Sequence, residues 1–192
     1  TKTLFAAGFE TTATALAWAL HCLSHHPEAA EVWHAEADRV LDGRTPVWED
    51  ISRLGYTSQV VQETLRLYPP VYTMGRRCVD DDELGGHPIR RGENLLLSIF
   101  GAHRMAEFWP DPDRFDPGRF APGRLWTRHA FLPFALGKHQ CVGNSFALAE
   151  AALILGLIGS AELALVGFGA TGPAGKVLCI FLSGLPLGAV WG

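Results

Sequence analysis

The first 26 residues of the chain, TKTLFAAGFETTATALAWALHCLSHH, constrain its fold more than any other segment. They are rich in Ala and Leu, which favour helix, and the helix they predict is apolar on most of its sides. A helix without a clear polar face belongs inside a large protein. No Ser, Asp or Asn with an acid three residues later marks its start. We therefore expect a helix that is already under way at the first residues, and we interpret the chain as a fragment.

The composition is that of an ordinary globular protein. Of the 192 residues, 48% are hydrophobic and 19% are charged, and the formal net charge is −4. This charge excludes the basic surface that binds nucleic acid or an anionic membrane. The longest apolar run, residues 151–161, is too short to span a bilayer and predicts a buried core helix.

The four cysteines, Cys22, Cys78, Cys141 and Cys179, lie far apart in the sequence. No Cys-x-x-Cys pair suggests zinc or a redox couple. A chain of this size does not need disulfides, so we expect a reducing compartment, the cytoplasm. A membrane anchor in a preceding N-terminal half remains an alternative.

Apolar spacing and the proline and glycine positions predict the other elements. Helices are expected from Pro27 to a stop at Gly43, over residues 59–68 and over residues 144–165. Extended structure is expected over residues 71–99, with strands at 77–79 and 95–99 and turns at 85–86 and 91–92. The tail predicts a hairpin of residues 177–182 and 187–190, and residues 110–123 predict an ordered non-helical segment. The fold class is mainly α with small β-sheets (α+β).

The loop FLPFALGKHQCVGNSFALAE carries the sharpest chemical signal. Phe134, Gly137, His139, Cys141 and Gly143 form the pattern Phe-x-x-Gly-x-His-x-Cys-x-Gly ahead of a predicted helix. Unpaired N–H groups and the helix dipole at such a position favour the thiolate, which is the form that binds metal. Flanking glycines let the backbone approach a large flat ligand. The alternative is an inert buried thiol.

This loop resembles the haem-binding loop of the cytochrome P450 family, the haem-thiolate monooxygenases, and the similarity continues through Phe146, Ala147 and Glu150. Three more segments resemble motifs of that family, in the family's order. They are AGFETT (residues 7–12, the oxygen-activation motif), ETLR (63–66, the Glu-x-x-Arg helix) and FWPDPDRFDPGRF (108–120, which ends in an Arg-Phe pair). The resemblance implies the cytochrome P450 fold, with residues 1–192 as the C-terminal part of a single domain.

The resemblance implies haem b (iron protoporphyrin IX) as the cofactor. Cys141 would be the axial ligand of the haem iron, Phe134 would pack beneath the haem, and Gly143 would let the next helix start close to it. Gly137 belongs to the same loop. His139 would bind a haem propionate, although a solvent-facing loop histidine is its alternative.

Arg76, ten residues before Gly86, stands where many bacterial relatives keep an arginine that binds a propionate. The neighbouring Arg77 leaves the choice between them open.

The resemblance assigns Glu10 and Thr11 to proton delivery toward bound oxygen. Thr11 and Thr12 can bond back to the carbonyls four residues earlier, which distorts a helix. Gly8 has no side chain, so an opened turn there would make room for dioxygen and water. From the residues alone, an exposed polar stripe is the alternative.

Glu63 and Arg66 are three residues apart and can pair on one face of a helix. Spacing alone points Arg66 away from the apolar stripe and predicts a surface ion pair of little energetic worth. The resemblance instead implies a buried pair that interacts with Arg119.

Val71 and Tyr72, with Thr73, resemble the strand that lines the family's substrate pocket. Phe5, with Leu4, precedes the oxygen motif and is expected to face substrate as well; core packing is the alternative for these residues. The histidines at 21, 25 and 26 are explained by a helix end rather than by a metal site.

The function that the resemblance implies is insertion of one oxygen atom from dioxygen into an organic substrate. Electrons would come from NAD(P)H through a ferredoxin or a flavin reductase, and Lys138 would help to dock an acidic donor. A peroxygenase or isomerase on the same scaffold is one alternative, and a haem-free, non-catalytic remnant is another. Gly118 and Ala135 depart from the Glu and Gly usual in the family, and the family's N-terminal half is expected to be missing.

Overall fold

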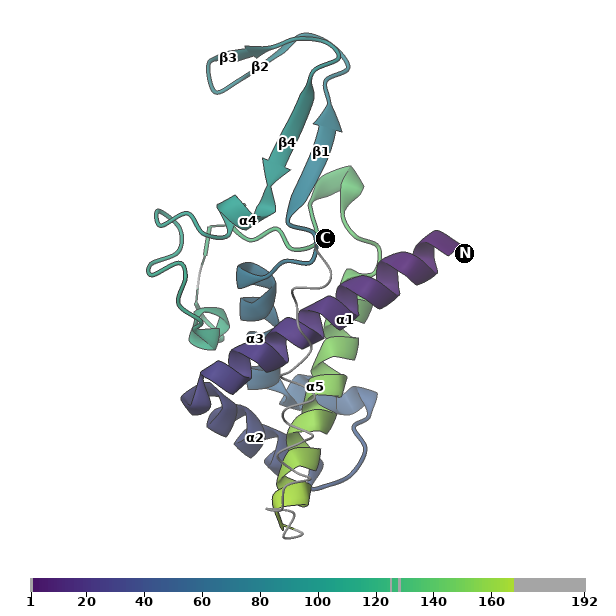
Figure 1. Ribbon diagram of the computed structural model, residues 1–192, viewed down its shortest axis with the longest axis vertical. Coiled ribbons are helices and arrows are strands. Elements are labelled where there is room, and N and C mark those ends of the chain that lie inside the picture. Colours follow the sequence, from purple (N-terminus) through teal and green to yellow (C-terminus); the bar gives the residue numbers. More distant parts are fainter. Residues whose placement is uncertain (1, 125, 128, 168–192) are drawn as a thin grey trace, which may run out of the picture.

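The computed structural model describes residues 2–124, 126–127 and 129–167, without the side chains of residues 2–6 and 161–167. Four long helices form one body, and two small antiparallel sheets extend from one end of it (Figure 1). The predicted α+β class is therefore confirmed. The hairpin expected at residues 177–190 lies outside the described residues.

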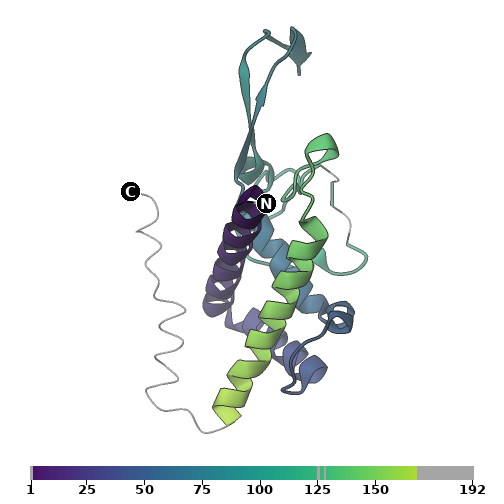
Figure 2. The ribbon, with the colours of Figure 1, turned by 90° about the vertical axis from the view of Figure 1, so that its right-hand side faces the viewer.

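Helices α1 (Lys2–His25), α2 (Pro27–Leu41), α3 (Gly55–Leu67) and α5 (Asn144–Gly167) enclose the main core. Figures 1 and 2 show α1 and α5 crossing over α3. Each helix contributes apolar side chains that are almost fully buried: Ala19, Leu23, Trp33, Val60 and Leu155. Among the described residues, no helix is long and apolar enough to cross a membrane.

Two glycines of α5 set how closely it approaches its neighbours. A Cβ atom on Gly159 would lie 3.0 Å from the Cβ of Ala37 and 3.0 Å from Cε2 of Trp33. A Cβ on Gly156 would lie 3.0 Å from Cδ1 of Leu54. The absence of these two side chains lets α5 pack tightly on α2 and on the segment before α3.

Helix α3 begins at Gly55, four residues before the predicted position. Its first N–H groups are capped by a residue from another helix: the buried carboxylate of Glu36 accepts from the backbone N–H groups of Tyr56 and Thr57, at 2.8 Å each, and from the Thr57 hydroxyl. Sequence reasoning looks for a cap next to the helix it caps. It therefore missed an acceptor 20 residues upstream.

The strand predictions need correction. Strand β1 (Thr73–Arg77) pairs with β4 (Asn94–Ser98), and β2 (Asp82–Leu84) pairs with β3 (His87–Ile89) around the predicted turn at 85–86. The first strand thus precedes residues 78–79, because Thr73 is in register with Ser98 and Arg77 with Asn94. Ile99 lies outside the last strand, since Ser98 caps the short helix α4 (Ile99–Ala102) by accepting from the Gly101 N–H.

Three short 3-10 helices complete the described chain: η1 (Trp48–Arg53), η2 (Pro117–Phe120) and η3 (Gly137–His139). Of these, η2 corrects the prediction that residues 110–123 contain no helix. Pro117 at its first turn and the Asp116 carboxylate, which accepts from the Gly118 N–H at 3.0 Å, start this single turn.

Candidate functional site

The loop that carries Cys141 is closed by a backbone hydrogen bond. The Cys141 N–H donates to the carbonyl of Phe134 at 2.8 Å, and the Gln140 N–H donates to the carbonyl of Gly137 at 3.1 Å. Gly137 has a φ of 66° and Ala135 a φ of 57°, so both occupy the left-handed region. This conformation favours glycine, so it suits the glycine that is usual at position 135 in the family; Ala135 departs from that pattern and adopts the same conformation at a steric cost. These bonds fold the loop back on itself, and the loop ends at Cys141, three residues before the first residue of α5.

The Cys141 thiol is exposed, which does not fit the alternative of an inert buried cysteine. Val142 and Phe146 beside it are 91% and 68% exposed. A Cβ on Gly143 would lie 3.9 Å from the Cys141 sulfur, an ordinary van der Waals contact, so the sulfur lies close to the start of α5. Phe134 packs against the core between α3 and α5 and lines a cavity of about 180 Å³ with Leu65 and Leu148.

The proton-delivery motif lies on an intact helix. Thr11 donates from its hydroxyl to the carbonyl of Ala7 at 2.6 Å, as the spacing predicts. The turn around Gly8 nevertheless remains α-helical, so the expected opening of the helix is wrong for this structure. A single back-bond of this kind uses the second lone pair of a carbonyl and leaves the helix ladder in place. Glu10 is exposed, and no hydrogen bond within the described residues joins Glu10 or Thr11 to the cysteine loop.

Glu63 and Arg66 form a fully buried ion pair, with two parallel hydrogen bonds of 2.7 and 2.8 Å. Arg119 approaches the same carboxylate, with Nε 3.4 Å from Oε1 of Glu63. Oε1 also accepts from the Asp116 N–H at 2.9 Å. The surface pair that spacing alone predicts is therefore wrong. The segment around residues 103–116 covers that side of α3 and supplies partners for the charge.

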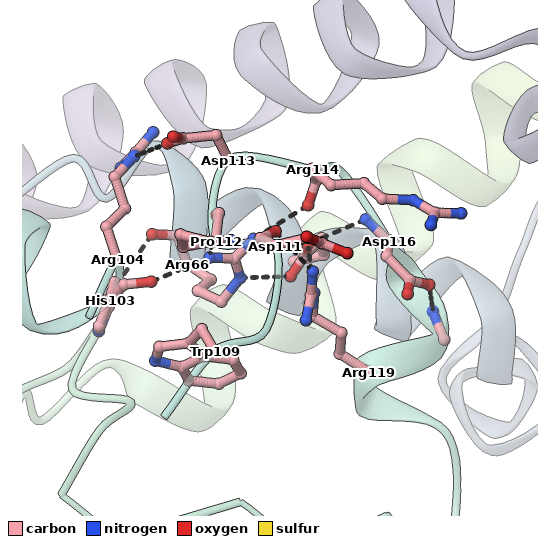
Figure 3. Close-up of polar contacts among 12 residues, drawn as sticks. Arg66, His103, Arg104, Trp109, Asp111, Pro112, Asp113, Arg114, Asp116 and Arg119 are labelled. Carbon is pink, nitrogen blue, oxygen red and sulfur yellow. Dashed lines mark hydrogen bonds and ion pairs between the residues drawn. The ribbon is translucent and has the colours of Figure 1, made fainter. Parts of the chain in front are cut away.

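Arg66 is bonded through every N–H group of its guanidinium. Besides Glu63, it donates to the carbonyls of His103 at 2.9 Å, Pro112 at 2.7 Å and Arg114 at 3.1 Å (Figure 3). Its guanidinium carbon also lies 5.2 Å from the ring centroid of Trp109, which is close enough for a cation–π contact. These contacts satisfy all five donors that an arginine possesses.

The remaining predicted site residues lie in α1, in η3, and in and just before β1. Arg76 is half-buried in β1, and its Nη1 donates to the carbonyl of Gly75. His139 and Lys138 are exposed in η3. Val71 and Tyr72 are 46% and 48% exposed just before β1. The Phe5 side chain lies outside the described part of the structure.

The histidines near the end of α1 bond to the helix itself: His25 and His26 each pair, through Nδ1, with the carbonyl four residues earlier. In the described part of the chain, no group of three or more His, Cys, Asp or Glu side chains is arranged to hold a metal ion.

Comparison with known proteins decides the family. The family model for cytochrome P450 matches residues 1–158. The chain belongs to the cytochrome P450 family. A second family model, for a family of unknown function (DUF5690), matches residues 141–192.

Two relatives from Streptomyces melanosporofaciens support this membership. A cyclooctat-9-en-7-ol 5-monooxygenase is 44% identical over 160 residues, which are 82% of this chain and 35% of the relative. A cyclooctatin synthase is 43% identical over 158 residues, 81% of this chain and 34% of the relative. The chain thus spans about a third of the length of these curated relatives.

Membership of the cytochrome P450 family implies a haem cofactor, and the residues present fit one. A cysteine thiolate is a soft ligand that suits iron in haem. The exposed sulfur belongs to a segment whose apolar side chains Leu136, Val142 and Phe146 are also exposed, which suits a flat apolar ligand. The cysteine loop and the N-terminal half of α1 lie toward the same end of the helical body (Figures 1 and 2).

Sequence reasoning missed one buried residue beside the Glu63–Arg66 pair, His103. Its side chain is fully buried between α3 and the segment that leads to the cysteine. In the sequence it stands directly before Arg104, between the ETLR motif and the segment of residues 108–120. No periodicity reveals that two distant backbone groups bond to its ring.

Proposed function

We propose that this chain forms the thiolate side of a haem monooxygenase, in which the Cys141 thiolate would bind the iron of haem b. The observation that carries the proposal is an exposed Cys141 thiol in a closed loop, directly ahead of α5 in a chain of the cytochrome P450 family. The bound haem would supply dioxygen activation, so that one oxygen atom enters an organic substrate. We also propose that residues 1–192 are the C-terminal part of one domain.

The loop residues would hold the haem. Phe134, fixed between α3 and α5, supports the loop from below, and Gly137 and Gly143 allow its backbone to approach the ring. His139 and Arg76 would donate to the haem propionates, since both carry N–H donors that suit carboxylates.

Helix α1 would supply the protons. Glu10 is an exposed acid next to the Thr11 hydroxyl, and such a pair suits a proton relay. Gly8 has no atoms within 4 Å of the place where a Cβ would stand, which leaves room beside the helix for dioxygen and water. Phe5, Val71 and Tyr72 would contact the substrate.

Electrons would come from NAD(P)H through a ferredoxin or a flavin reductase. Lys138, exposed in the cysteine loop, is suited to attract an acidic donor protein, and added salt should then slow reduction. The free cysteines of the described chain favour the reducing cytoplasm as its location.

The test compares the chain with Cys141→Ser after reconstitution with haem. Total haem is measured as the pyridine haemochrome, and thiolate ligation is measured from the carbon monoxide difference spectrum of the reduced protein. We expect about one haem per chain and the thiolate band in the parent, and loss of that band in Cys141→Ser. The control Cys78→Ser, which changes a cysteine bonded to the Asp80 carbonyl, should keep the band.

A thiolate band that persists in Cys141→Ser would overturn the proposal. A parent chain that takes up no haem would instead favour the second candidate function, a haem-free and non-catalytic chain. The exposure of Phe9, Val142 and Phe146 is the observation that favours this second candidate.

A further inference from the structure

His103 lies at the end of α4 and is fully buried, yet it belongs to none of the motifs discussed so far. Its ring bonds to two backbone groups that are far apart in the sequence. Nδ1 lies 3.1 Å from the carbonyl oxygen of Arg66, at the end of α3. Nε2 lies 2.7 Å from the backbone nitrogen of Leu132.

These two partners determine the protonation state of the ring. A backbone carbonyl only accepts, so Nδ1 must carry a hydrogen and donate to Arg66. A backbone N–H only donates, so Nε2 must be unprotonated and accept from Leu132. His103 is therefore neutral, with the proton on Nδ1. Burial, together with the nearby charges of Arg66 and Arg104, lowers the pKa of His103 to about 4.

Two backbone hydrogen bonds connect the segment that begins at Leu132 to Cys141. The Leu132 carbonyl accepts from the Ala135 N–H at 3.2 Å, and the Phe134 carbonyl accepts from the Cys141 N–H at 2.8 Å. Phe131, the residue before Leu132, packs with its ring centroid 5.2 Å from that of His103. The ring of His103 thus fixes the point at which the cysteine-bearing segment leaves the protein body.

On the other side, His103 is coupled to the buried ion pair. Its carbonyl accepts from Nη1 of Arg66, while its ring donates to the Arg66 carbonyl. The two residues therefore bond to each other twice, in opposite directions. This arrangement leaves the ring little freedom to rotate away from Leu132.

We propose that His103 is a positioning residue for the thiolate ligand: it ties Leu132 to the end of α3 and so holds the segment 132–141 in the conformation that presents Cys141. The role in ligation rests on the proposed function, whereas the ordering of the segment does not depend on haem.

Three substitutions separate the two ring bonds. His103→Gln places an amide oxygen at the position of Nε2 and keeps an acceptor for Leu132. His103→Asn places its amide at the position of Nδ1 and keeps only the donor to Arg66. His103→Phe keeps the packing on Phe131 and loses both bonds. His87→Phe, on the exposed β3 strand, is the matched control.

The first measurement is amide hydrogen exchange of the haem-free chain at residues 131–143. We expect His103→Phe and His103→Asn to raise the exchange rate of Leu132 and the loop by roughly five- to tenfold, since a buried N–H loses its acceptor. His103→Gln should stay within about twofold of the parent, and His87→Phe should not differ from it. Unchanged exchange at residues 131–143 in His103→Phe would overturn the proposal.

The second measurement is the fraction of thiolate-ligated haem relative to total haem, from the two spectra described above. We expect this fraction to fall several-fold in His103→Phe and His103→Asn and to be restored in His103→Gln. Equal fractions in all variants would overturn the role in ligation. Absence of haem from the parent would overturn the proposed function instead, and the exchange rates would still decide whether His103 orders the segment.

Discussion

At the scale of single residues, Glu63 is a buried carboxylate whose charge is paired with Arg66. It and Arg66 have no exposed side-chain surface, and the carboxylate receives bonds from Arg66 and from the Asp116 backbone. Such a pair adds little net stability compared with apolar residues, but removing one partner leaves an uncompensated charge in the interior.

Glu63→Ala should therefore destabilise the chain by about 3–5 kcal/mol and prevent the haem-loaded fold. Urea denaturation followed by circular dichroism gives the free energy of unfolding. Asp113→Ala is the control: its carboxylate pairs with Arg104 but is 84% exposed, so its loss should cost less than about 1 kcal/mol. Full haem uptake by Glu63→Ala would contradict the prediction.

His103 should make stability depend on pH. Its pKa of about 4 in the fold lies below the ordinary 6.5, so the unfolded chain binds the proton more readily between these values. The free energy of unfolding then falls as the pH drops through this window. Relative to His103→Gln, the parent should lose about 2 kcal/mol between about pH 7 and pH 5. If the free energy of unfolding changes by the same amount in the two proteins between these pH values, the lowered pKa of His103 is refuted.

At the scale of elements, boundaries and packing depend on contacts from elsewhere in the chain. Glu36 of α2 caps α3, and Gly159 of α5 has no side chain, so Trp33 of α2 can pack closely against it. The sequence predicts that these helices exist, because apolar spacing and prolines are local signals. It does not predict where α3 begins or how α5 packs, since those depend on partners far away in sequence.

Glu36→Ala leaves two N–H groups at the start of α3 and the buried Thr57 hydroxyl without their acceptor. We expect a loss of about 1–3 kcal/mol in the free energy of unfolding and faster amide exchange at Tyr56 and Thr57. Glu49→Ala, at an exposed position of η1, should change stability by less than about 0.5 kcal/mol. Exchange that is unaltered at residues 56–57 would show that the cap is dispensable.

Gly159→Ala adds a Cβ at 3.0 Å from both Ala37 and Trp33, and it should destabilise the chain by about 1–3 kcal/mol. Gly8→Ala is the counterpart on α1, with nothing within 4 Å of its Cβ, and should stabilise by about 0.5–1 kcal/mol. Thermal unfolding of both variants measures the difference. The prediction fails if the two substitutions shift the melting temperature in the same direction.

At the scale of the whole molecule, large apolar side chains remain on the surface around the cysteine loop and on the first half of α1. Phe9, Val142 and Phe146 are each more than two-thirds exposed. An apolar area of this kind marks a surface that binds a ligand or a partner. Under the proposed function, haem bound to this area would link thiolate ligation to the stability of the entire chain.

Haem added at about 100 times its dissociation constant should raise the free energy of unfolding by roughly 2.7 kcal/mol. The same addition to Cys141→Ser should give a smaller gain, because the iron–sulfur bond is missing. Equal gains in the two proteins would place the haem elsewhere. Calorimetric melts with and without haem provide the comparison.

The sequence could nominate most of the candidate site because its residues lie in short motifs, and their roles in binding haem stay predictions. The Glu63 pair illustrates the limit: helical spacing placed Arg66 in solvent, and only the resemblance indicated burial. His103 marks a further limit. Neither its neighbours nor its spacing indicates that it bonds to Leu132 and Arg66, since that contact arises only when three separate segments come together.

The five bonds of Arg66 also have a topological consequence. One planar cation joins α3 to backbone positions 37, 46 and 48 residues further along the chain. Like a covalent cross-link, these hydrogen bonds close loops of the chain that lie one inside another. The entropic cost of closing each loop rises only slowly with its length. A lysine at this position, with three hydrogens on a single nitrogen, could not reach all these acceptors at once, so the loops would no longer be fastened together.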